Sequence, residues 1–187
     1  LTINDMKGAD FDDERWDELT GKVSVKEFMS FAENAFHAIG AIDSIGLQQM
    51  TSDDGPGGSD SHYLNEGQYQ GTPYADGDEY ADKSSRVAPS PVNLAYSWNK
   101  ELAYCNGEVI LGESSLVFNL PIMIGPAMNV HRHAYNSRGV EYYSEDPILS
   151  GYIGSAVVQG AQSKGTLVNV KHLAFNDQEI NRSGVAS

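Results

Sequence analysis

The sequence predicts an α/β fold with a parallel sheet, and two strands with a helix between them carry that prediction. Residues 121–125 and 166–170 are short apolar runs of the kind that form buried strands. Between them, Asp146-Pro147 supplies an N-cap and a first helical residue, and apolar residues follow at helical spacing up to Gly165. Strand, helix and strand in this order are typical of parallel α/β sheets.

The N-terminal part of the chain predicts an acidic lead-in followed by one helix. Residues 1–20 carry a run of acidic side chains, and we expect Phe11 and Trp16 to attach this segment to the rest of the fold. Ser24 and Glu27 have the spacing of a capping box, and Gly40 can end the helix that begins there. The positions expected to face the core of the protein are Phe28, Phe31, Ala32, Ala35, Phe36 and Ile39.

The middle of the chain predicts a short strand, a long loop and a second helix. Residues 47–51 are the strand candidate, and a turn follows at Asp54-Gly55-Pro56. Residues 57–88 are rich in Gly, Ser, Asp and Tyr without periodicity, so we expect a long loop, which in a compact domain usually serves function. Ser90-Pro91 then begins a helix whose buried stripe is expected to be Leu94, Ala95, Trp98 and Leu102.

Composition limits the classes of partner. The chain has 187 residues, 40% of them hydrophobic, which is enough for one domain with a core. Twelve basic residues against 26 acidic ones give a net charge of −14, which argues against nucleic acid and against an anionic membrane surface. A neutral substrate suits this charge better, and ten Tyr and two Trp offer aromatic faces for one.

Cysteine content and hydropathy add little about the compartment. Cys105 is the only cysteine, so the chain has no internal disulfide, and no apolar stretch reaches membrane-spanning length. The first residues lack a basic region, a cleavage site and an initiator Met, which suggests a mature or excised piece. The compartment is left open, with the cytoplasm slightly favoured over secretion.

Charged side chains gather where the predicted strands end. Asp54 follows the first strand, His131-Arg132 follows the second, and Lys171-His172 follows the third. In α/β folds, ligands bind outside the carboxyl ends of parallel strands. A carboxylate, two cations and two imidazoles suit a polyhydroxylated ligand, because each hydroxyl can donate to the carboxylate and accept from a cation.

Other interpretations of these residues stay open. Asp54-Gly55-Pro56 alone is an ordinary turn. Arg132 and Arg138 can form a structural ion-pair network, for which the candidate partners are Glu141, Glu145 and Asp146. A metal-dependent hydrolase is a further alternative, with His131, His133 and His172 as ligands, although no ordered carboxylate or cysteine partner accompanies them.

Several motifs, taken together and in order, resemble one family. Residues 125–132, 138–147 and 171–182 resemble the N-terminal barrel domain of glycoside hydrolase family 3, the family of retaining β-glucosidases and related exo-acting enzymes. The Asp54 turn and the helix at 91–102 match family segments in the right order. The resemblance implies a partial (β/α)8 TIM-type barrel over residues 21–187, roughly its first half, with parallel strands and outer helices.

The resemblance also implies roles for matching residues. The residues expected to line the −1 subsite and bind sugar hydroxyls are Asp54, Arg132, Lys171, His172 and Arg182. Arg138 and Glu141 match family positions that support the residues lining this subsite. Residues 136–141 depart from the family pattern Gly-Gly-Arg-Asn-Phe-Glu, and Ser59 and Asp60 stand near where the family often has Arg. Residues 171–176 also lack the signature of the β-N-acetylglucosaminidase branch, which favours glucosidase-like substrates.

The family's catalytic groups are not recognised in this sequence. No Ser-Asp-Trp motif, which carries the family nucleophile, occurs, and the acid/base Glu normally comes from a second, sandwich domain. The expected function is therefore a fragment of a retaining exo-acting β-glycosidase that acts on terminal β-D-glucosyl residues, with no cofactor or metal. Its expected partners are a β-glucoside or oligosaccharide, the rest of the barrel and the sandwich domain. The alternatives are a β-xylosidase, or a non-catalytic sugar-binding or structural half-domain that needs a partner chain.

Overall fold

The computed structural model describes residues 1–33, 38–54, 88–113, 121–174 and 176–181. The chain divides into two compact units, Leu1–Ser52 and Asp53–Ser187, which we describe separately. Nearly all of the predicted loop at 57–88, including Ser59 and Asp60, lies outside the described residues, as does Arg182. Among the described helices, none combines the length and apolar content needed to cross a bilayer.

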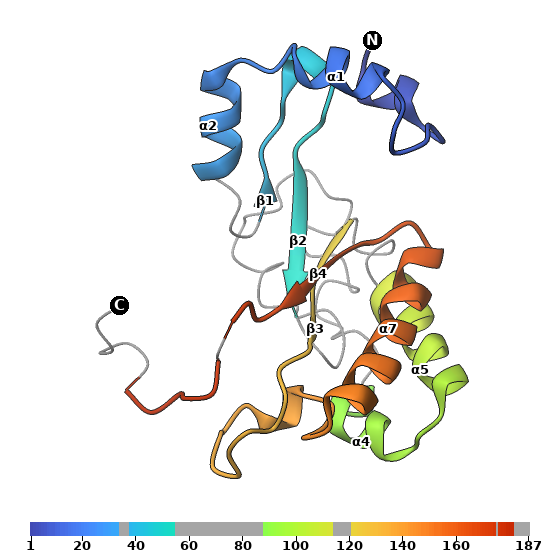
Figure 1. The fold of residues 1–187 in the computed structure, drawn as a ribbon, viewed down its shortest axis with the longest axis vertical. Helices are drawn as coiled ribbons and strands as arrows, with labels where there is room; N and C mark the ends of the chain where they lie inside the picture. The colour runs from blue at the N-terminus through green and yellow to red at the C-terminus, as the bar shows by residue number, and fades with distance from the viewer. Residues whose placement is uncertain (34–37, 55–87, 114–120, 175, 182–187) are drawn as a thin grey trace, which may run out of the picture. The chain divides into compact units, whose positions relative to one another are not determined.

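The first unit is built from short helices around a small apolar core. A 3-10 turn at Ile3–Met6 is followed by α1 (Arg15–Thr20) and α2 (Val25–Glu33) (Figure 1). The buried apolar side chains among its described residues are Met6, Leu19, Ile42 and Ile45. Trp16 packs against this cluster, and its indole N–H donates to the carbonyl of Asp10 at 2.9 Å. Phe11 is 95% exposed, so only one of the two aromatic residues attaches the acidic segment to a core.

The capping box of α2 is confirmed, but the predicted extent of the helix is wrong. Ser24 and Glu27 exchange hydrogen bonds through the backbone N–H of each, at 2.9 and 3.2 Å. The helix is described only to Glu33, and residues 38–39 form strand β1 (Ala38–Ile39) instead of its last turn. Ala35 and Phe36 lie outside the described residues, and Phe28 is 59% exposed.

Strand pairing explains why residues 38–39 are not helical. β1 pairs with β2 (Met50–Asp54), with Ala38 opposite Thr51 and Ile39 opposite Met50. This pairing gives the backbone of both strands a hydrogen-bond partner that helical spacing in the sequence cannot reveal. The pairing is antiparallel, so β1 is an addition to the parallel strands that the sequence predicts.

The second unit contains the predicted strand–helix–strand segment. β3 (Ile122–Ala127) pairs in parallel with β4 (Leu167–Lys171), and Ile122 lies opposite Leu167. The helix that connects them is α7 (Pro147–Ser163). α7 lies on one side of the two strands together with α4 (Pro91–Tyr96) and α5 (Lys100–Asn106) (Figure 1). This arrangement confirms the sequence-based prediction for residues 121–170.

Helix α7 begins and packs as its sequence predicts. The Asp146 carboxylate accepts from the backbone N–H of Ile148 at 2.7 Å and of Leu149 at 3.4 Å, which caps the helix. A π-helical segment (Gly107–Glu113) continues α5 against α7. A side chain at Gly160 would collide with the carbonyl of Tyr104, so the close approach of the two helices requires glycine there. The buried residues of α7 include Leu149, Ile153, Ala156, Val157, Gly160 and Ala161.

Two predictions about burial in this unit are wrong. The stripe on residues 91–102 is interrupted, because the backbone of Trp98 turns left-handed (φ 53°) and Asn99 caps a new helix, α5. Leu94 and Ala95 are buried, but Trp98 is 70% exposed and Leu102 is 47% exposed.

The second burial error concerns β4, which was expected to be a buried strand. Leu167 is 49% exposed and Val170 is 47% exposed, since β4 is an edge strand of the described sheet. An edge strand lacks a neighbour on one side, so apolar side chains that a further strand would cover remain open to solvent.

Candidate functional site

The site forms where β2 and β4 end. Lys171 Nζ lies 2.5 Å from Asp54 Oδ1, although 117 positions separate the two residues in the sequence. The side chain of Lys171 is only 12% exposed, and that of Asp54 is 33% exposed. Because little water reaches the ammonium group, this ion pair is stronger than an ordinary surface pair.

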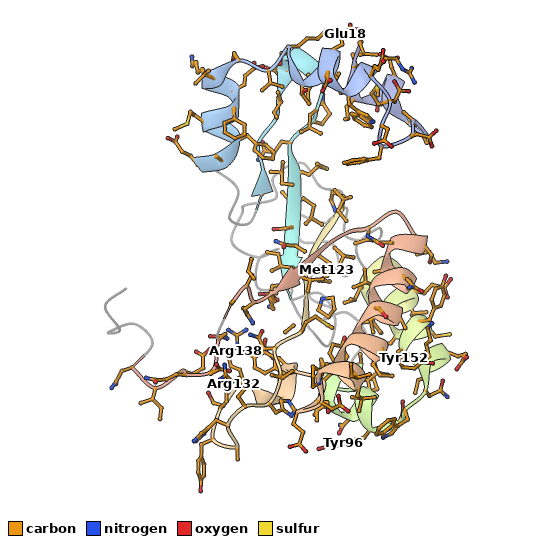
Figure 2. All side chains as sticks on the ribbon, viewed as in Figure 1. Glu18, Tyr96, Met123, Arg132, Arg138 and Tyr152 are labelled. Carbon is orange, nitrogen blue, oxygen red and sulfur yellow. The ribbon has the colours of Figure 1, made fainter. Side chains whose placement is uncertain are left out.

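Arg138 is the centre of a second charged cluster. Its Nε and Nη2 donate to the two carboxylate oxygens of Glu141, each at 2.6 Å, and its Nη1 lies 3.4 Å from Glu179. The hydrogen bonds that Arg138 donates to Glu141 raise the pKa of Arg138, so the guanidinium stays charged. A two-point bond of this kind fixes both position and orientation, which makes Arg138 a rigid part of the site. Arg132 and Arg138 approach the C-terminal segment from the same loop (Figure 2).

His172 connects this cluster to the end of β4. Its Nε2 lies 3.0 Å from Arg138 Nη2, and its Nδ1 lies 3.1 Å from the side-chain oxygen of Asn129. Burial lowers the pKa of His172, and the positive charges of Arg138 and Lys171 lower it further. The imidazole therefore favours the neutral form, which can both donate and accept one hydrogen bond.

Tyr142 is a fully buried residue beneath the two histidines. Its hydroxyl donates to the carbonyl of Asn176 at 3.1 Å and accepts from the Asn176 amide at 2.7 Å. The Tyr142 ring meets His172 edge-on at a centroid distance of 6.0 Å, and it is tilted against His131 at 6.2 Å. Burial raises the pKa of Tyr142, so its hydroxyl stays protonated. Tyr142 thus holds the segment after β4 in place.

The His131-Arg132 pair is held differently. His131 Nε2 lies 2.7 Å from the carbonyl oxygen of Gly139 and 3.1 Å from that of Tyr142. Since carbonyls only accept, this nitrogen carries a proton and serves to hold the loop. Arg132 is 58% exposed and lies 3.4 Å from Asp177, at the limit of a hydrogen bond.

The structure brings most of the predicted site residues together in two groups. Asp54 pairs with Lys171, and Arg138 joins Glu141 to His172. The alternative of a structural ion-pair network is confirmed for Arg138, which pairs with Glu141, whereas the ion pair of Arg132 is with Asp177, which was not among the predicted partners. Within the described parts of the chain, no three His, Cys, Asp or Glu side chains could hold a metal ion. His133 is exposed, and its Nδ1 accepts from the backbone N–H of Tyr135.

Sequence reasoning missed several residues that complete the site. They are Asn129, Tyr142, Asn176 and, as contributors of charge, Asp177 and Glu179. Asn129 lies in the same strand-end loop as His131-Arg132, so its position was a usable signal. The polar run at 176–179 follows the end of β4, and the same reasoning about strand ends applies to it.

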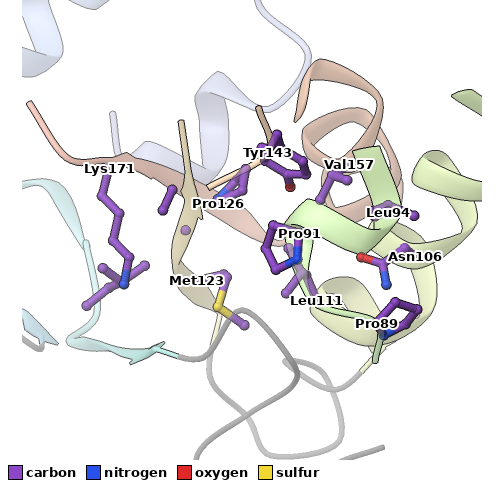
Figure 3. Close-up of a pocket in the computed structure, with 13 residues that line it drawn as sticks. Pro89, Pro91, Leu94, Asn106, Leu111, Met123, Pro126, Tyr143, Val157 and Lys171 are labelled. Carbon is purple, nitrogen blue, oxygen red and sulfur yellow. The ribbon is translucent and has the colours of Figure 1, made fainter. Parts of the chain in front are cut away.

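Two hollows lie near these residues, and they differ in character. An open polar groove of about 500 Å³ is lined by Val92, His131, Arg132, His133, Ala134, Asn136, Gly139, Val140 and Glu145. A second space of about 10 Å³ lies in the apolar core, and it has room for about one water molecule. Figure 3 shows Lys171 on one side of β3, and Leu94, Val157 and Tyr143 on the other. The second hollow is thus a packing space and not a sugar site.

The parallel βα architecture with charged strand ends defines a partial α/β barrel, as the comparison with known proteins confirms. The family model "Glycosyl hydrolase family 3 N terminal domain" matches residues 76–185. The chain therefore belongs to glycosyl hydrolase family 3, within that N-terminal domain. The described sheet and its helices are consistent with the partial α/β barrel that the sequence predicts.

Relatives and solved structures agree with this assignment. A probable beta-glucosidase J from Neosartorya fischeri is 29% identical over 91% of this chain, and an exo-alpha-(1->6)-L-arabinopyranosidase from Bifidobacterium longum is 31% identical over 84%. The chain covers 18% and 20% of those two proteins, so it spans about a fifth of their length.

Beta-glucosidase 3B from Thermotoga neapolitana, in complex with alpha-D-glucose, superposes with a TM-score of 0.62. The two sequences are 33% identical, and the match covers 76% of this chain and 18% of the Thermotoga chain. The beta-glucosidase from Kluyveromyces marxianus, in complex with glucose, gives a TM-score of 0.70, with 29% identity over 87% of this chain and 18% of its own.

Proposed function

We propose that this chain is part of a retaining, exo-acting β-glycosidase that hydrolyses terminal non-reducing β-D-glucosyl residues. The observation that carries the proposal is the ion pair between Asp54 and Lys171, held at the ends of β2 and β4 with the ammonium largely shielded from water. Family membership and the beta-glucosidases among the relatives support the same substrate class.

The proposed subsite binds the sugar through groups of opposite kinds. The carboxylate of Asp54 accepts hydrogen bonds from sugar hydroxyls, and Lys171 donates to their oxygens. His172 lies next to Lys171, Arg132 reaches the site from the loop after β3, and Arg182 contributes from the segment after β4. Arg138 and Glu141 support this wall through their two-point ion pair. A substrate analogue without one of the hydroxyls leaves a shielded charge without its partner and binds worse.

We propose that the carboxyl groups that cleave the bond come from outside this chain. A retaining mechanism needs two carboxyl groups about 5 Å apart, one as nucleophile and one as acid/base. Glu141 and Glu179 both contact the Arg138 guanidinium, and Asp54 contacts Lys171, so each of these carboxylates is engaged in an ion pair. The rest of the barrel and a further domain would then supply the reacting groups.

Hydrolysis of p-nitrophenyl β-D-glucoside by the full-length enzyme that carries this chain tests the proposal. Asp54→Asn keeps the shape of the side chain and removes its charge, so we expect kcat/KM to fall by more than tenfold, since a charged hydrogen bond contributes about 1.5–3 kcal/mol. Asp17→Asn, at an exposed position of α1, is the matched control and should leave kcat/KM unchanged. Equal kinetics for both variants would remove Asp54 from the subsite.

The choice of sugar is tested with the same enzyme. A preference for the β-D-glucoside over p-nitrophenyl β-D-xyloside and p-nitrophenyl α-L-arabinopyranoside supports the proposal. The opposite order of preference would make the preferred pentoside, and not the glucoside, the substrate of the enzyme. The arabinopyranosidase among the relatives makes this comparison necessary. Binding of glucose without turnover of any of the three would instead favour a sugar-binding half-domain. Proton NMR of the first product gives the anomer, and an α-anomer would contradict retention.

A further inference from the structure

His172 is held through both ring nitrogens and through its backbone. Nε2 lies 3.0 Å from Arg138 Nη2, and Nδ1 lies 3.1 Å from Asn129 Oδ1. The backbone N–H of His172 donates to the same Asn129 oxygen at 2.8 Å. The imidazole therefore lies between a guanidinium group on one side and an amide oxygen on the other.

The partners of His172 define where its proton is. A guanidinium group has donors and no acceptor, so Nε2 must accept the hydrogen bond from Arg138. A neutral imidazole that accepts at Nε2 carries its proton on Nδ1, and this N–H then donates to Asn129. The orientation of the Asn129 amide follows independently, because the backbone N–H of His172 can only meet its oxygen. The Asn129 NH₂ group in turn donates to the carbonyl of His172 at 3.4 Å.

Asn129 also joins the ends of two neighbouring strands. It follows β3 by two residues, whereas His172 follows β4 directly. Next to it, the backbone N–H of Met128 donates to the carbonyl of Lys171 at 2.6 Å, which ties the same two segments together. On the other side of the ring, Arg138 is fixed by its two bonds to Glu141. The ring is thus held from both sides by groups that cannot easily turn.

We propose that Asn129 is a positioning residue of this site, which fixes His172 as the Nδ1-protonated tautomer and so presents Nε2 as a hydrogen-bond acceptor. The inference rests on the proposed function, in which His172 lines the sugar subsite. A ligand group that reaches Nε2 must then donate, as a sugar hydroxyl does, and it takes the place of the Arg138 N–H at the single lone pair of this nitrogen. The neighbouring Lys171 ammonium only donates, so residues 171 and 172 offer a hydroxylated ligand one donor and one acceptor.

Nitrogen NMR of the full-length enzyme, labelled with ¹⁵N-histidine, tests the tautomer without any sugar. The signal of His172 is identified by its loss in His172→Gln. In the wild-type enzyme we expect the proton on Nδ1. Asn129→Asp keeps the oxygen acceptor, replaces the NH₂ group by a second oxygen and so places a carboxylate opposite Nδ1; the titration midpoint of His172 should therefore rise by about one pH unit or more. The other charged or titratable groups facing the ring, Arg138, Lys171, Glu141, Asp54 and Tyr142, are unchanged in this variant.

Asn99→Asp is the matched control for the change from amide to carboxylate. Asn99 caps α5 by accepting from the backbone N–H of Leu102 at 2.9 Å, and Asp caps helices equally well. The midpoint of His172 should therefore stay at its wild-type value in this variant. A proton on Nε2 in the wild-type enzyme, or a midpoint in Asn129→Asp equal to that in Asn99→Asp, would overturn the proposal.

Binding of D-glucose then separates the positioning role from the proposed function. We expect Asn129→Ala to weaken D-glucose binding by at least tenfold, and Asn99→Asp to leave it unchanged. If Asn129→Ala does not fold, the same comparison is made with Asn129→Asp below its raised midpoint, where the imidazolium cannot accept from a hydroxyl. Wild-type affinity in these Asn129 variants would contradict the positioning role. A wild-type enzyme with the predicted tautomer but no affinity for sugar would instead contradict the proposed function.

Discussion

The two strand-end dipeptides, His131-Arg132 after β3 and Lys171-His172 after β4, resemble each other in sequence and differ in structure. In the first, the imidazole holds backbone carbonyls of its own loop, and the cation is 58% exposed. In the second, the imidazole contacts side chains from elsewhere in the fold, and the cation is 12% exposed. Similar charge at two strand ends therefore gives a loop anchor in one case and a cluster with side chains from elsewhere in the fold in the other.

The difference comes from what each dipeptide packs against. The loop after β3 turns back on itself, so Gly139 and Tyr142 are the groups within reach of His131. The segment after β4 runs beside that loop, so His172 meets Asn129, Arg138 and Tyr142. Contacts with distant residues bury the second pair, and burial is what makes a charge both costly and selective. The two cations should accordingly differ in their importance for catalysis.

The largest effect is expected from Lys171→Met, compared with Arg132→Met. Both changes remove a cation and keep much of the apolar stem. Loss of the shielded ammonium leaves Asp54 without that partner, so we expect kcat/KM for p-nitrophenyl β-D-glucoside to fall about 10- to 100-fold, or about 1.5–3 kcal/mol. Arg132→Met should cost less than tenfold, because solvent screens its contact with Asp177. A larger loss from Arg132 would reverse the comparison.

Arg138→Lys tests whether the rigid cluster behind the second dipeptide supports it. Lysine keeps the charge but cannot bond both oxygens of Glu141 while donating to His172. We expect the free energy of unfolding to fall by about 1.5 kcal/mol, since one of the two charged bonds to Glu141 is lost. Urea unfolding of the full-length enzyme measures this change.

The control for Arg138→Lys is Arg15→Lys. Arg15 makes a similar two-point contact with Asp13, but its side chain is 51% exposed. We expect no measurable change in the urea midpoint for this variant. An equal shift for both variants would show that the two-point geometry matters without burial.

His131→Ala tests the anchoring role of the first dipeptide. Without the imidazole, the carbonyls of Gly139 and Tyr142 lose a donor, and we expect a loss of stability of about 1 kcal/mol. His133→Ala, two residues further along the same loop and exposed, is the control and should change stability by less than about 0.5 kcal/mol. A fall in kcat/KM of His131→Ala without a change in melting temperature would assign His131 to the site and not to the loop.

The comparison also shows which features the sequence could predict. Strands β3 and β4, predicted at 121–125 and 166–170, and the start of α7 depend on local signals, namely apolar runs and the Asp146-Pro147 cap. The break at Trp98, the antiparallel pairing of β1 and the exposure of Val170 depend on partners distant in sequence, and they were not predicted.

In the site, too, features that depend on local sequence were predicted and features that depend on distant partners were not. The charged strand ends were visible as motifs, but their pairing was not, because it depends on the register between strands. Nothing in the sequence indicates that Lys171 selects Asp54, or that Arg138 reaches His172 over 34 positions. Asn129 carries no charge, so a search for charged groups could not find it.

The smallest effect is expected in the pH dependence of stability, where His172 contributes through its lowered pKa. Burial and the nearby Arg138 and Lys171 favour the neutral ring in the folded protein, while in the unfolded chain the pKa of His172 lies near the ordinary histidine value of 6.5. Below that pH the unfolded state binds more protons, so the free energy of unfolding is highest above pH 6.5 and falls as the pH drops toward the folded pKa. His172→Gln removes this contribution, so its unfolding free energy should depend less on pH between 6.5 and the folded pKa. His133→Gln, which removes an exposed imidazole, is the reference for that slope. Identical slopes for the two variants would mean that the Arg138 side of the ring does not keep His172 neutral, and the distinction between the two dipeptides would then rest on the cations alone.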